Sequence, residues 1–450
     1  MNLYISVEVL VRELDSKLLL AVIAASRGHE VIVSDNESII KGLERKLLKP
    51  GLYLTKSLVP SKAKLKRHKK IIELGSKISS IDEEGGLVDY GYDQMIRLRY
   101  DIQTIAQASA VFTWGKEDFI ALKKSFPKYS KKFYMTGSPR SDLWTTKFSS
   151  YWKKDFKKFN KPYLLIPSNF GAGLAHLSFY ERMMIRKKRG YFEKEYGYVK
   201  MAMKRESELF KFISYFIEAI EHLSKKKKYH VVLRPHPAEN EKIWKILLSN
   251  ISNVSVIKKD GISHWVENSF AILHNGCTTA LEARISQKPV ITYSPFKASY
   301  DRKLANDLGE KVTNLSNLSK KVDSIFLKYL KKNKFNKPFP KILTNKIFID
   351  KKETAAEKIV NVWEKLSDHR HSKKNNWFLY KSSLKIMKLN KFRSKIFKKN
   401  YKTEENYKFP PFEKKKIDYK IDELVKIMGI NKKISCTLFS DRTILIKQNN

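Results

Sequence analysis

Short apolar runs alternate with helix-period segments along the first 150 residues of the chain. Residues 3–9 read as a strand, residues 14–25 carry apolar side chains at helical spacing, and 31–33 form a second apolar run. A strand, a helix and a strand in this order predict a parallel sheet with a right-handed crossover. Further strands are expected at 77–81, 110–113 and 132–135, and each ends in a polar segment that contains glycine: DEEGG, WG and TGSPR. Such exits are typical of a doubly wound sheet, whose ligands bind at the carboxyl ends of the strands.

A second series of strands follows a polar, basic and aromatic stretch at 145–161. Its expected strands are 163–166, 229–233, 254–257, 271–273 and 290–292, with helices at 179–223 and 353–366. We therefore predict an N-terminal Rossmann-like domain at 1–150 and a second one at 160–366. Residues 367–450 form a charged and aromatic extension with a helix at 417–428, and we expect it either to pack back on the first domain or to reach a membrane.

Composition narrows the class of protein. The 450 residues include 42% hydrophobic side chains, so the chain can bury substantial cores. The chain has 90 Lys and Arg and 46 Asp and Glu, which gives a formal charge of +44. This charge suits nucleic acid, an anionic membrane face or an anionic substrate as a partner. The alternative is that it reflects a lysine-rich composition alone. No nucleic-acid-binding motif and no single basic arm are present, so no nucleic acid is expected as a partner. Lysine clusters at 62–70, 225–228, 395–399 and 414–416 are typical of solvated faces, but they also suit anionic lipid.

The two cysteines indicate neither a disulfide framework nor a zinc site, because the sequence has no CxxC motif and no Cys/His spacing typical of metal ligands. No run approaches the ~20 apolar residues of a spanning helix. We expect a cytoplasmic protein, peripheral at the inner face of the membrane.

The sequence RPHP follows the expected strand at 229–233. Its prolines make the strand exit rigid, so Arg234 can present a fork of donors to phosphate and His236 a donor to a phosphate or ribose oxygen. The alternative is a turn whose histidine is satisfied by the backbone.

The sequence HNGCTT follows another expected strand, at 271–273. Gly276 lets the backbone approach a ligand closely, and Asn275 lies beside it. Thr278 and Thr279 begin a helix whose N-terminus suits an anion, and Glu282, one turn later, suits the hydroxyls of a ribose. An ordinary helix cap is the alternative. Two further strand exits supply candidate loops around a cleft, with Asn169 and Gly171 in one and Gly137 and Arg140 in the other.

Asp82, Glu83 and Glu84 follow the expected strand at 77–81. Adjacent carboxylates repel each other, so at least one of them should have a raised pKa if the group is partly buried. Such an acid suits general-base or nucleophilic work on a hydroxyl, and the two glycines after it would leave room for a substrate. The alternative is an acidic turn on a very basic protein.

The pairing of an acidic D/E-D/E-G motif with a later His-Pro motif resembles bacterial sialyltransferases and polysialyltransferases, which have the GT-B fold. The RPHP loop and the later hydroxyl pair also resemble those of capsule Kdo transferases and CDP-glycerol glycerophosphotransferases. The segments VRELDSKLLLA, DEEGGLV, VFTWGKEDF, TGSPRSDLW and IPSNFG are similar to the bacterial surface carbohydrate (surface polysaccharide) biosynthesis protein family. This resemblance covers the chain from Tyr4 to about Pro295, with a weaker echo at 408–412.

The resemblance implies an α/β, GT-B-like fold with two Rossmann-like domains facing a cleft. It implies that Glu84 is the general base, with Glu83 first in the motif, that His236 contacts the donor's phosphate and that Thr278–Thr279 hold the donor. The expected function is transfer of an acidic sugar of the Kdo or sialic-acid kind from a CMP-activated donor to a carbohydrate or lipid-linked acceptor, without metal or other cofactor. A CDP-glycerol-type polyol-phosphate transferase, a nucleic-acid-binding protein and a non-catalytic scaffold stay open as alternatives.

Overall fold

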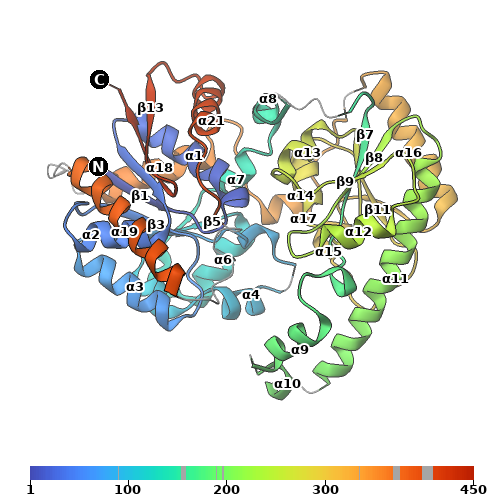
Figure 1. Cartoon of the computed structure of the whole chain (residues 1–450), viewed down its shortest axis with the longest axis horizontal. Coiled ribbons are helices and arrows are strands. Elements are labelled where there is room, and N and C mark those ends of the chain that lie inside the picture. Colours follow the sequence, from blue (N-terminus) through green and yellow to red (C-terminus); the bar gives the residue numbers. More distant parts are fainter. Residues whose placement is uncertain are drawn as a thin grey trace. The chain divides into compact units, whose positions relative to one another are not determined.

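The computed structural model describes the chain except residues 90, 154–158, 189, 195–196, 334, 368–374, 398–408 and 450, and it describes the backbone alone at 92, 93, 194 and 391–397. The chain divides into two compact units (Figure 1). The first unit comprises Met1–Leu143 and Thr344–Asn450, and the second comprises Trp144–Leu343.

The first unit is built on an eight-stranded sheet in the order β13-β14-β2-β1-β3-β4-β5-β6. Strands β1 to β6 are parallel, and β14 pairs antiparallel with both β2 and β13. The chain order reverses between β1 and β3, which makes this the switch point of the sheet. The strands are β1 (Asn2–Ser6), β2 (Glu30–Ser34), β3 (Leu52–Thr55), β4 (Lys77–Ile81), β5 (Ala110–Thr113), β6 (Phe133–Met135), β13 (Ile434–Ser440) and β14 (Thr443–Gln448).

Helices surround this sheet. The middle of α1, from Leu18 to Ala25, has no exposed surface except for 3% of Ile23. An unbroken run of apolar side chains there permits burial on all sides of the helix. The helices are α1 (Leu10–Ser26), α2 (Asn36–Glu44), α3 (Lys62–Glu73), α4 (Tyr92–Arg99), α5 (Ile102–Gln107), α6 (Lys116–Ser125), α7 (Pro139–Asp142), α18 (Ala355–Leu366), α19 (Trp377–Phe397) and α21 (Lys414–Ile427).

The second unit is built on a six-stranded parallel sheet in the order β12-β11-β10-β7-β8-β9. Counted within the unit, this is the Rossmann order, and its switch point lies between β7 and β10. The elements are α8 (Ser149–Lys153), β7 (Tyr163–Pro167), α9 (Phe179–Lys188), α10 (Tyr191–Lys194), α11 (Tyr198–Ser224), β8 (His230–Arg234), α12 (Glu241–Leu247), β9 (Val254–Val256), α13 (Ile262–Asn268), β10 (Ala271–His274), α14 (Thr279–Ile285), β11 (Val290–Tyr293), α15 (Lys303–Asn306), β12 (Glu310–Val312) and α16 (Leu315–Leu330); α17 (Lys341–Lys346) leads back to the first unit.

The fold class expected from the sequence, two doubly wound α/β domains of Rossmann type, is confirmed by these strand orders. The division of the chain differs from the expected one. Helix α18 was assigned to the second domain, but it packs on α1 in the first unit, where Asp142 accepts hydrogen bonds from the N–H groups of Ala355 and Ala356 at 3.1 Å and the indole of Trp363 donates to Ser79. The extension from 367 onward supplies β13 and β14, which cover the β2 edge of the first sheet. One lysine cluster, 395–399, lies outside the residues whose side chains are described.

Candidate functional site

Two polar loops meet at the switch point of the second unit. The loop after β7 contains Asn169, whose side-chain amide donates to the carbonyl of Gly276 in the loop after β10, at 2.9 Å. Gly276 has a φ of +65°, and a Cβ there would lie 2.9 Å from Cδ of Arg302, so glycine is required both for conformation and for space. The structure thus brings together two residues that the sequence placed about 107 positions apart.

Glu239 organises the loops after β7 and β8. Its side chain is completely buried. Its Oε1 accepts from the backbone N–H groups of Phe170 and Gly171 at 2.9 and 3.0 Å, and its Oε2 accepts from the hydroxyl of Ser168 at 2.6 Å. The same Oε2 accepts from the indole of Trp244 at 3.0 Å and the N–H of His236 at 3.3 Å. A buried carboxylate is tolerated because these donors satisfy it, and it fixes both strand exits in one geometry.

His236 is exposed on the loop that Glu239 holds. The N–H of Ala238 donates to its Nδ1 at 3.1 Å, so the neutral ring carries its proton on Nε2. Its Nε2–H is the donor that the predicted contact with a phosphate or ribose oxygen would use, while the bond from Ala238 is what the alternative expects, a turn whose histidine is satisfied by the backbone.

Arg234 does not match its prediction. Its guanidinium is directed at the carbonyls of the loop after β9: it donates to Lys259 O at 2.6 Å and also contacts Asp260 O. It lies 5.7 Å from the ring centre of Trp265 and is 8% exposed. Since carbonyls that follow a short strand need donors, this arginine holds a neighbouring loop and is not directed at a phosphate.

The loop after β10 is held from several sides. Asn275 donates to Tyr293 O at 2.9 Å. Thr278 is exposed and makes no side-chain cap bond, and Thr279 is half-buried beside the Cys277 thiol at 3.3 Å. Helix α14 has seven residues, Thr279–Ile285. Glu282 is 3% exposed and lies in the interior of the unit, which does not favour the predicted contact with a ribose.

A cavity of about 30 Å³ lies between these two loops and α11. Asn169, Asn275 and Gly276 line it together with Arg205 and Arg302, which the sequence analysis did not single out. Arg302 donates to Gly276 O at 3.1 Å, and Arg205 lies 4.8 Å from the ring centre of Tyr300. Glu239 was also missed, although an acid three residues after the histidine of RPHPAE was the available signal.

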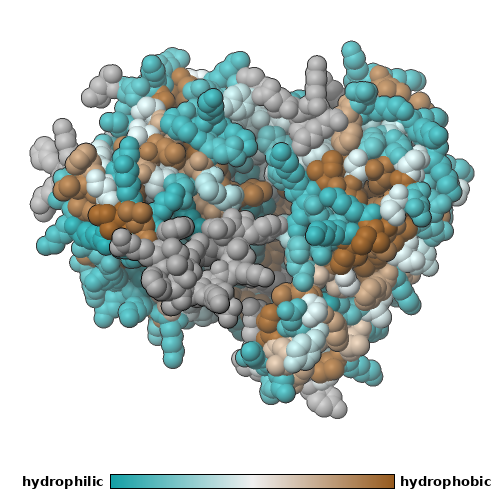
Figure 2. Space-filling model, viewed as in Figure 1, coloured by the Kyte–Doolittle hydropathy of each residue, from teal (hydrophilic) through white to brown (hydrophobic). Residues whose placement is uncertain are grey.

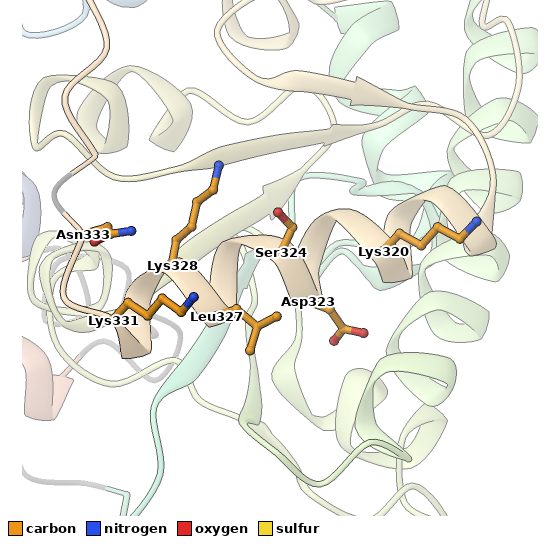
Figure 3. Close-up of a pocket in the computed structure, with 7 residues that line it drawn as sticks. All are labelled: Lys320, Asp323, Ser324, Leu327, Lys328, Lys331 and Asn333. Carbon is orange, nitrogen blue, oxygen red and sulfur yellow. The ribbon is translucent and has the colours of Figure 1, made fainter.

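A larger hollow of about 540 Å³ lies along α16. Figure 3 shows that its side chains come from this one helix and the residues directly after it. No strand exit contributes, so it is not a candidate for the same chemistry. The lining residues are Lys320, Asp323, Ser324, Leu327, Lys328, Lys331 and Asn333.

The three acids after β4 in the first unit have different environments. Asp82 is buried and accepts from Arg99 at 2.6 and 2.7 Å; burial raises its pKa, against the effect of that guanidinium. Glu84 is the exposed one, with 41% of its side chain accessible, and it accepts from Arg12 at 2.7 Å. Burial opposes its ionisation, but the charges of Arg12, Arg99 and Arg140 outweigh burial and hold the pKa of Glu84 below its usual value. The expected raised pKa is therefore found at Asp82 and not at the acid predicted to be the base.

Glu83 points into the unit and forms a buried ion pair with Lys17 of α1. Glu13, one turn earlier on α1, is also buried, and burial followed by the charge of Glu83 raises its pKa. The sequence analysis did not single out these charges in α1. A Glu and a Lys four residues apart in an otherwise buried helix were the signal, because buried charges need partners.

The glycines after Glu84 do not leave room for a substrate. A Cβ on Gly86 would lie 2.6 Å from the indole of Trp114, and one on Gly85 would lie 2.9 Å from it. The indole fills the space and donates to Asp82 O at 2.6 Å. Glycine is therefore needed for packing at this turn.

The loop after β6 contains Gly137 and Arg140, which the sequence predicted to lie beside a cleft, and Gly137 has a different role. Gly137 has a φ of +80°, and a Cβ there would lie 2.4 Å from Phe348 O, so it serves close packing of the backbone. Arg140 donates to Glu83 O at 3.2 Å, which places its guanidinium beside the acidic turn.

The described His, Cys, Asp and Glu side chains form no group of three or more that is suited to a metal ion. Among the described helices, none combines the length and apolarity that crossing a membrane requires.

Comparisons with known proteins give only distant likenesses. No family model and no curated protein sequence matches the chain. A putative UDP-N-acetylglucosamine 2-epimerase from Listeria monocytogenes has a TM-score of 0.49 at 12% identity over 83% of this chain and 99% of the epimerase. The UDP-GlcNAc 2-epimerase from Methanocaldococcus jannaschii has a TM-score of 0.48 at 14% identity over 81% of this chain and all of the epimerase. The wall teichoic acid polymerase TagF has a TM-score of 0.34 at 14% identity over 58% of this chain and 59% of the polymerase. Likenesses of this size say nothing about activity, and the fold assignment rests on the strand orders.

Proposed function

We propose that the protein is a glycosyltransferase of surface polysaccharide biosynthesis that transfers an acidic sugar, of the Kdo or sialic-acid kind, from a CMP-activated donor. The observation that carries the proposal is the switch point of the second unit. There, Asn169 joins the loops after β7 and β10, and Glu239 fixes the His236 loop beside them. In open parallel sheets of this order, nucleotides bind at this place.

On the donor side, CMP would leave as a phosphate monoester with two negative charges. The Nε2–H of His236 and the polar groups around Gly276 would bind this phosphate, and Arg302 supplies a cation at the same loop. Arg234 has no part in the proposal, because its donors hold the loop after β9. These residues need no metal for the binding of phosphate.

On the acceptor side, Glu84 would accept the proton of the attacking hydroxyl. Asp82 and Glu83 are buried and engaged by Arg99 and Lys17, so Glu84 is the acid of the three that a hydroxyl can reach. Its lowered pKa keeps it ionised at neutral pH and makes it a weaker base, which favours proton transfer late in the reaction. A lipid-linked acceptor would lie at a membrane, so peripheral contact with anionic lipid belongs to the proposal.

Nucleotide preference is tested by thermal shift with CMP, CDP-glycerol and UDP. A ligand present at 100 times its Kd adds about 2.7 kcal/mol to the stability of the folded state. We expect protection by CMP that is weakened in His236→Ala and unchanged in His222→Ala, an exposed histidine of α11. Protection by CDP-glycerol alone would favour the polyol-phosphate transferase instead.

Transfer is tested with CMP-sugars and the purified full chain. We expect Glu84→Gln to reduce turnover by about 10²–10⁴-fold, which is the usual contribution of a general base. The matched control is Glu73→Gln, an exposed acid on α3 whose side chain is 54% accessible. Near-normal turnover in both Glu84→Gln and His236→Ala would contradict the assignment.

A further inference from the structure

The segment from residue 177 to 210, which we call the α9–α11 arm, exposes an unusual amount of apolar surface. It comprises α9, α10 and the first half of α11, and in Figure 1 α9 and α10 lie at the end of α11 that is distant from the sheet of the second unit. Nine large hydrophobic side chains of its described residues are exposed, among them Phe179, Tyr180, Ile185, Met201 and Met203. Tyr180 is 71% exposed and Phe179 44%. Contiguous exposure of this kind marks a binding surface.

Helix α9 leaves its two aromatic side chains exposed to water. All ten of its residues are described, and none is buried. The most sheltered charged side chain is Arg182, 16% accessible, which forms a two-pronged pair with Glu206 of α11 at 2.6 and 3.0 Å. The ion pair thus holds α9 on α11 from the inside, and the aromatic side chains are left outside. A helix that leaves Phe179, Tyr180 and Ile185 exposed is arranged for an apolar partner.

The stacked rings of Tyr191 and Tyr198, 5.4 Å apart, join α10 to α11. Phe210 lies against Gly173, where a Cβ would come within 2.7 Å of its ring. The Phe210 contact fixes the arm to the unit and the tyrosine stack holds α10 on α11, so the exposed face is a formed surface.

The charge of the arm favours an anionic partner. Residues 177–210 contain nine Lys and Arg and five Glu, a formal charge of +4. Lys187, Lys188, Lys200 and Lys204 are exposed among the apolar side chains. Figure 2 shows brown and teal residues alternating over the part of the surface where α9 and α10 lie in Figure 1. Aromatic and aliphatic side chains interleaved with lysines match the boundary between the headgroups and acyl chains of an anionic bilayer.

We propose that the α9–α11 arm inserts its aromatic and aliphatic side chains into the headgroup region of an anionic phospholipid membrane, while its lysines contact the lipid phosphates. The proposal does not depend on which nucleotide the protein uses. It places membrane contact on the second unit and not on the lysine clusters that the sequence singled out.

The test is sedimentation of the full chain with vesicles of phosphatidylcholine alone or mixed with phosphatidylglycerol. We expect binding to the mixed vesicles, weakened about tenfold or more by the double variant Phe179→Ser, Tyr180→Ser. We expect a loss of at least about tenfold for Lys187→Glu, Lys188→Glu as well. Unchanged circular dichroism and thermal midpoints of the variants show that the loss comes from the surface.

Matched controls lie on α16, which also exposes apolar and basic side chains. Leu327 and Leu330 are 56% and 55% exposed, and Lys331 and Lys332 follow them. We expect Leu327→Ser, Leu330→Ser and Lys331→Glu, Lys332→Glu to bind vesicles like the unchanged protein. Loss of binding in the α16 variants with retention in the arm variants would overturn the proposal. A second result would also overturn the proposal: the unchanged protein forms dimers by light scattering, the arm variants are monomers, and no protein binds vesicles. The arm would then cover a second copy of the chain.

Discussion

Replacing Glu239 by Gln should release the loop after β8. In the glutamine, Oε1 can still accept from the N–H groups of Phe170 and Gly171, but an NH2 group replaces the oxygen that accepts from the Trp244 indole and the His236 N–H. The new NH2 group then faces the Trp244 indole and the His236 N–H, which are both donors, in a completely buried position. Each buried polar group left unsatisfied costs about 1–3 kcal/mol, and the 3.3 Å bond of His236 is the weaker, so we expect a loss of about 2–4 kcal/mol.

For a unit of this size, that loss corresponds to a fall in thermal midpoint of about 5–10 °C. Hydrogen exchange localises the effect: the amide of residue 236 in the loop after β8 should exchange faster, while those of β1 in the first unit should not change. Glu241→Gln is the matched control, because Glu241 forms only an exposed pair with Lys245, which is worth about 0.3–0.5 kcal/mol. The reasoning is refuted if Glu239→Gln shows the same stability and the same exchange at residue 236 as the unchanged protein.

Three further predictions concern single side chains. The pKa of Glu84 is depressed, so its contribution to the free energy of unfolding is present above the ordinary pKa and is lost as the pH falls through the depressed value. Arg12→Gln should make that loss smaller when urea unfolding is measured between pH 3 and 6. An unchanged pH profile would contradict the role of the Arg12 charge. Lys17→Met leaves Glu83 buried without its cation and should cost about 3–5 kcal/mol, most of which the additional change Glu83→Gln should restore in chemical denaturation; equal stability of the single and double variants would count against the pair. Gly171→Ala should cost about 1–3 kcal/mol through backbone strain alone, since the residue has φ +59° and ψ −112° and a Cβ would meet nothing within 4 Å; a neutral effect on the unfolding midpoint would mean that the loop can relax.

Much of the fold followed from local patterns. Short segments of three to five residues predicted β4, β5, β7 and β10 within one residue at each end, because most of them are apolar runs of the kind that burial on both faces of a parallel sheet requires. The strand β3, LYLT, was missed because the flanking glycine and lysines gave no periodicity, and β14 was missed because its partner β2 lies about 410 residues earlier in the chain. The broken helix at 179–223 was read as one element, since the apolar side chains of α9 keep a helical spacing although they are exposed.

The residues of the candidate site divide in the same way. Strand exits place His236, Asn275 and Gly276 near one edge by connectivity alone, so their proximity was predictable. The direction of a side chain at that edge was not: Arg234 has the residue type for phosphate but donates to backbone carbonyls 24–26 positions later. Glu83 and Glu84 are adjacent in sequence, yet one is buried against Lys17 and the other accepts from Arg12 at the surface.

The amino-acid sequence by itself determined two parallel α/β sheets and the positions of the polar loops at their carboxyl edges, because hydrophobic periodicity and strand exits are local properties of a chain. Only the tertiary structure decided which polar groups pair within each unit, that Glu239 holds two strand exits, that α18 and β14 complete the first unit, and that the aromatic side chains of α9 stay outside. These outcomes depend on contacts between residues far apart in the chain, where burial, charge pairing and available space decide together which partner each group finds.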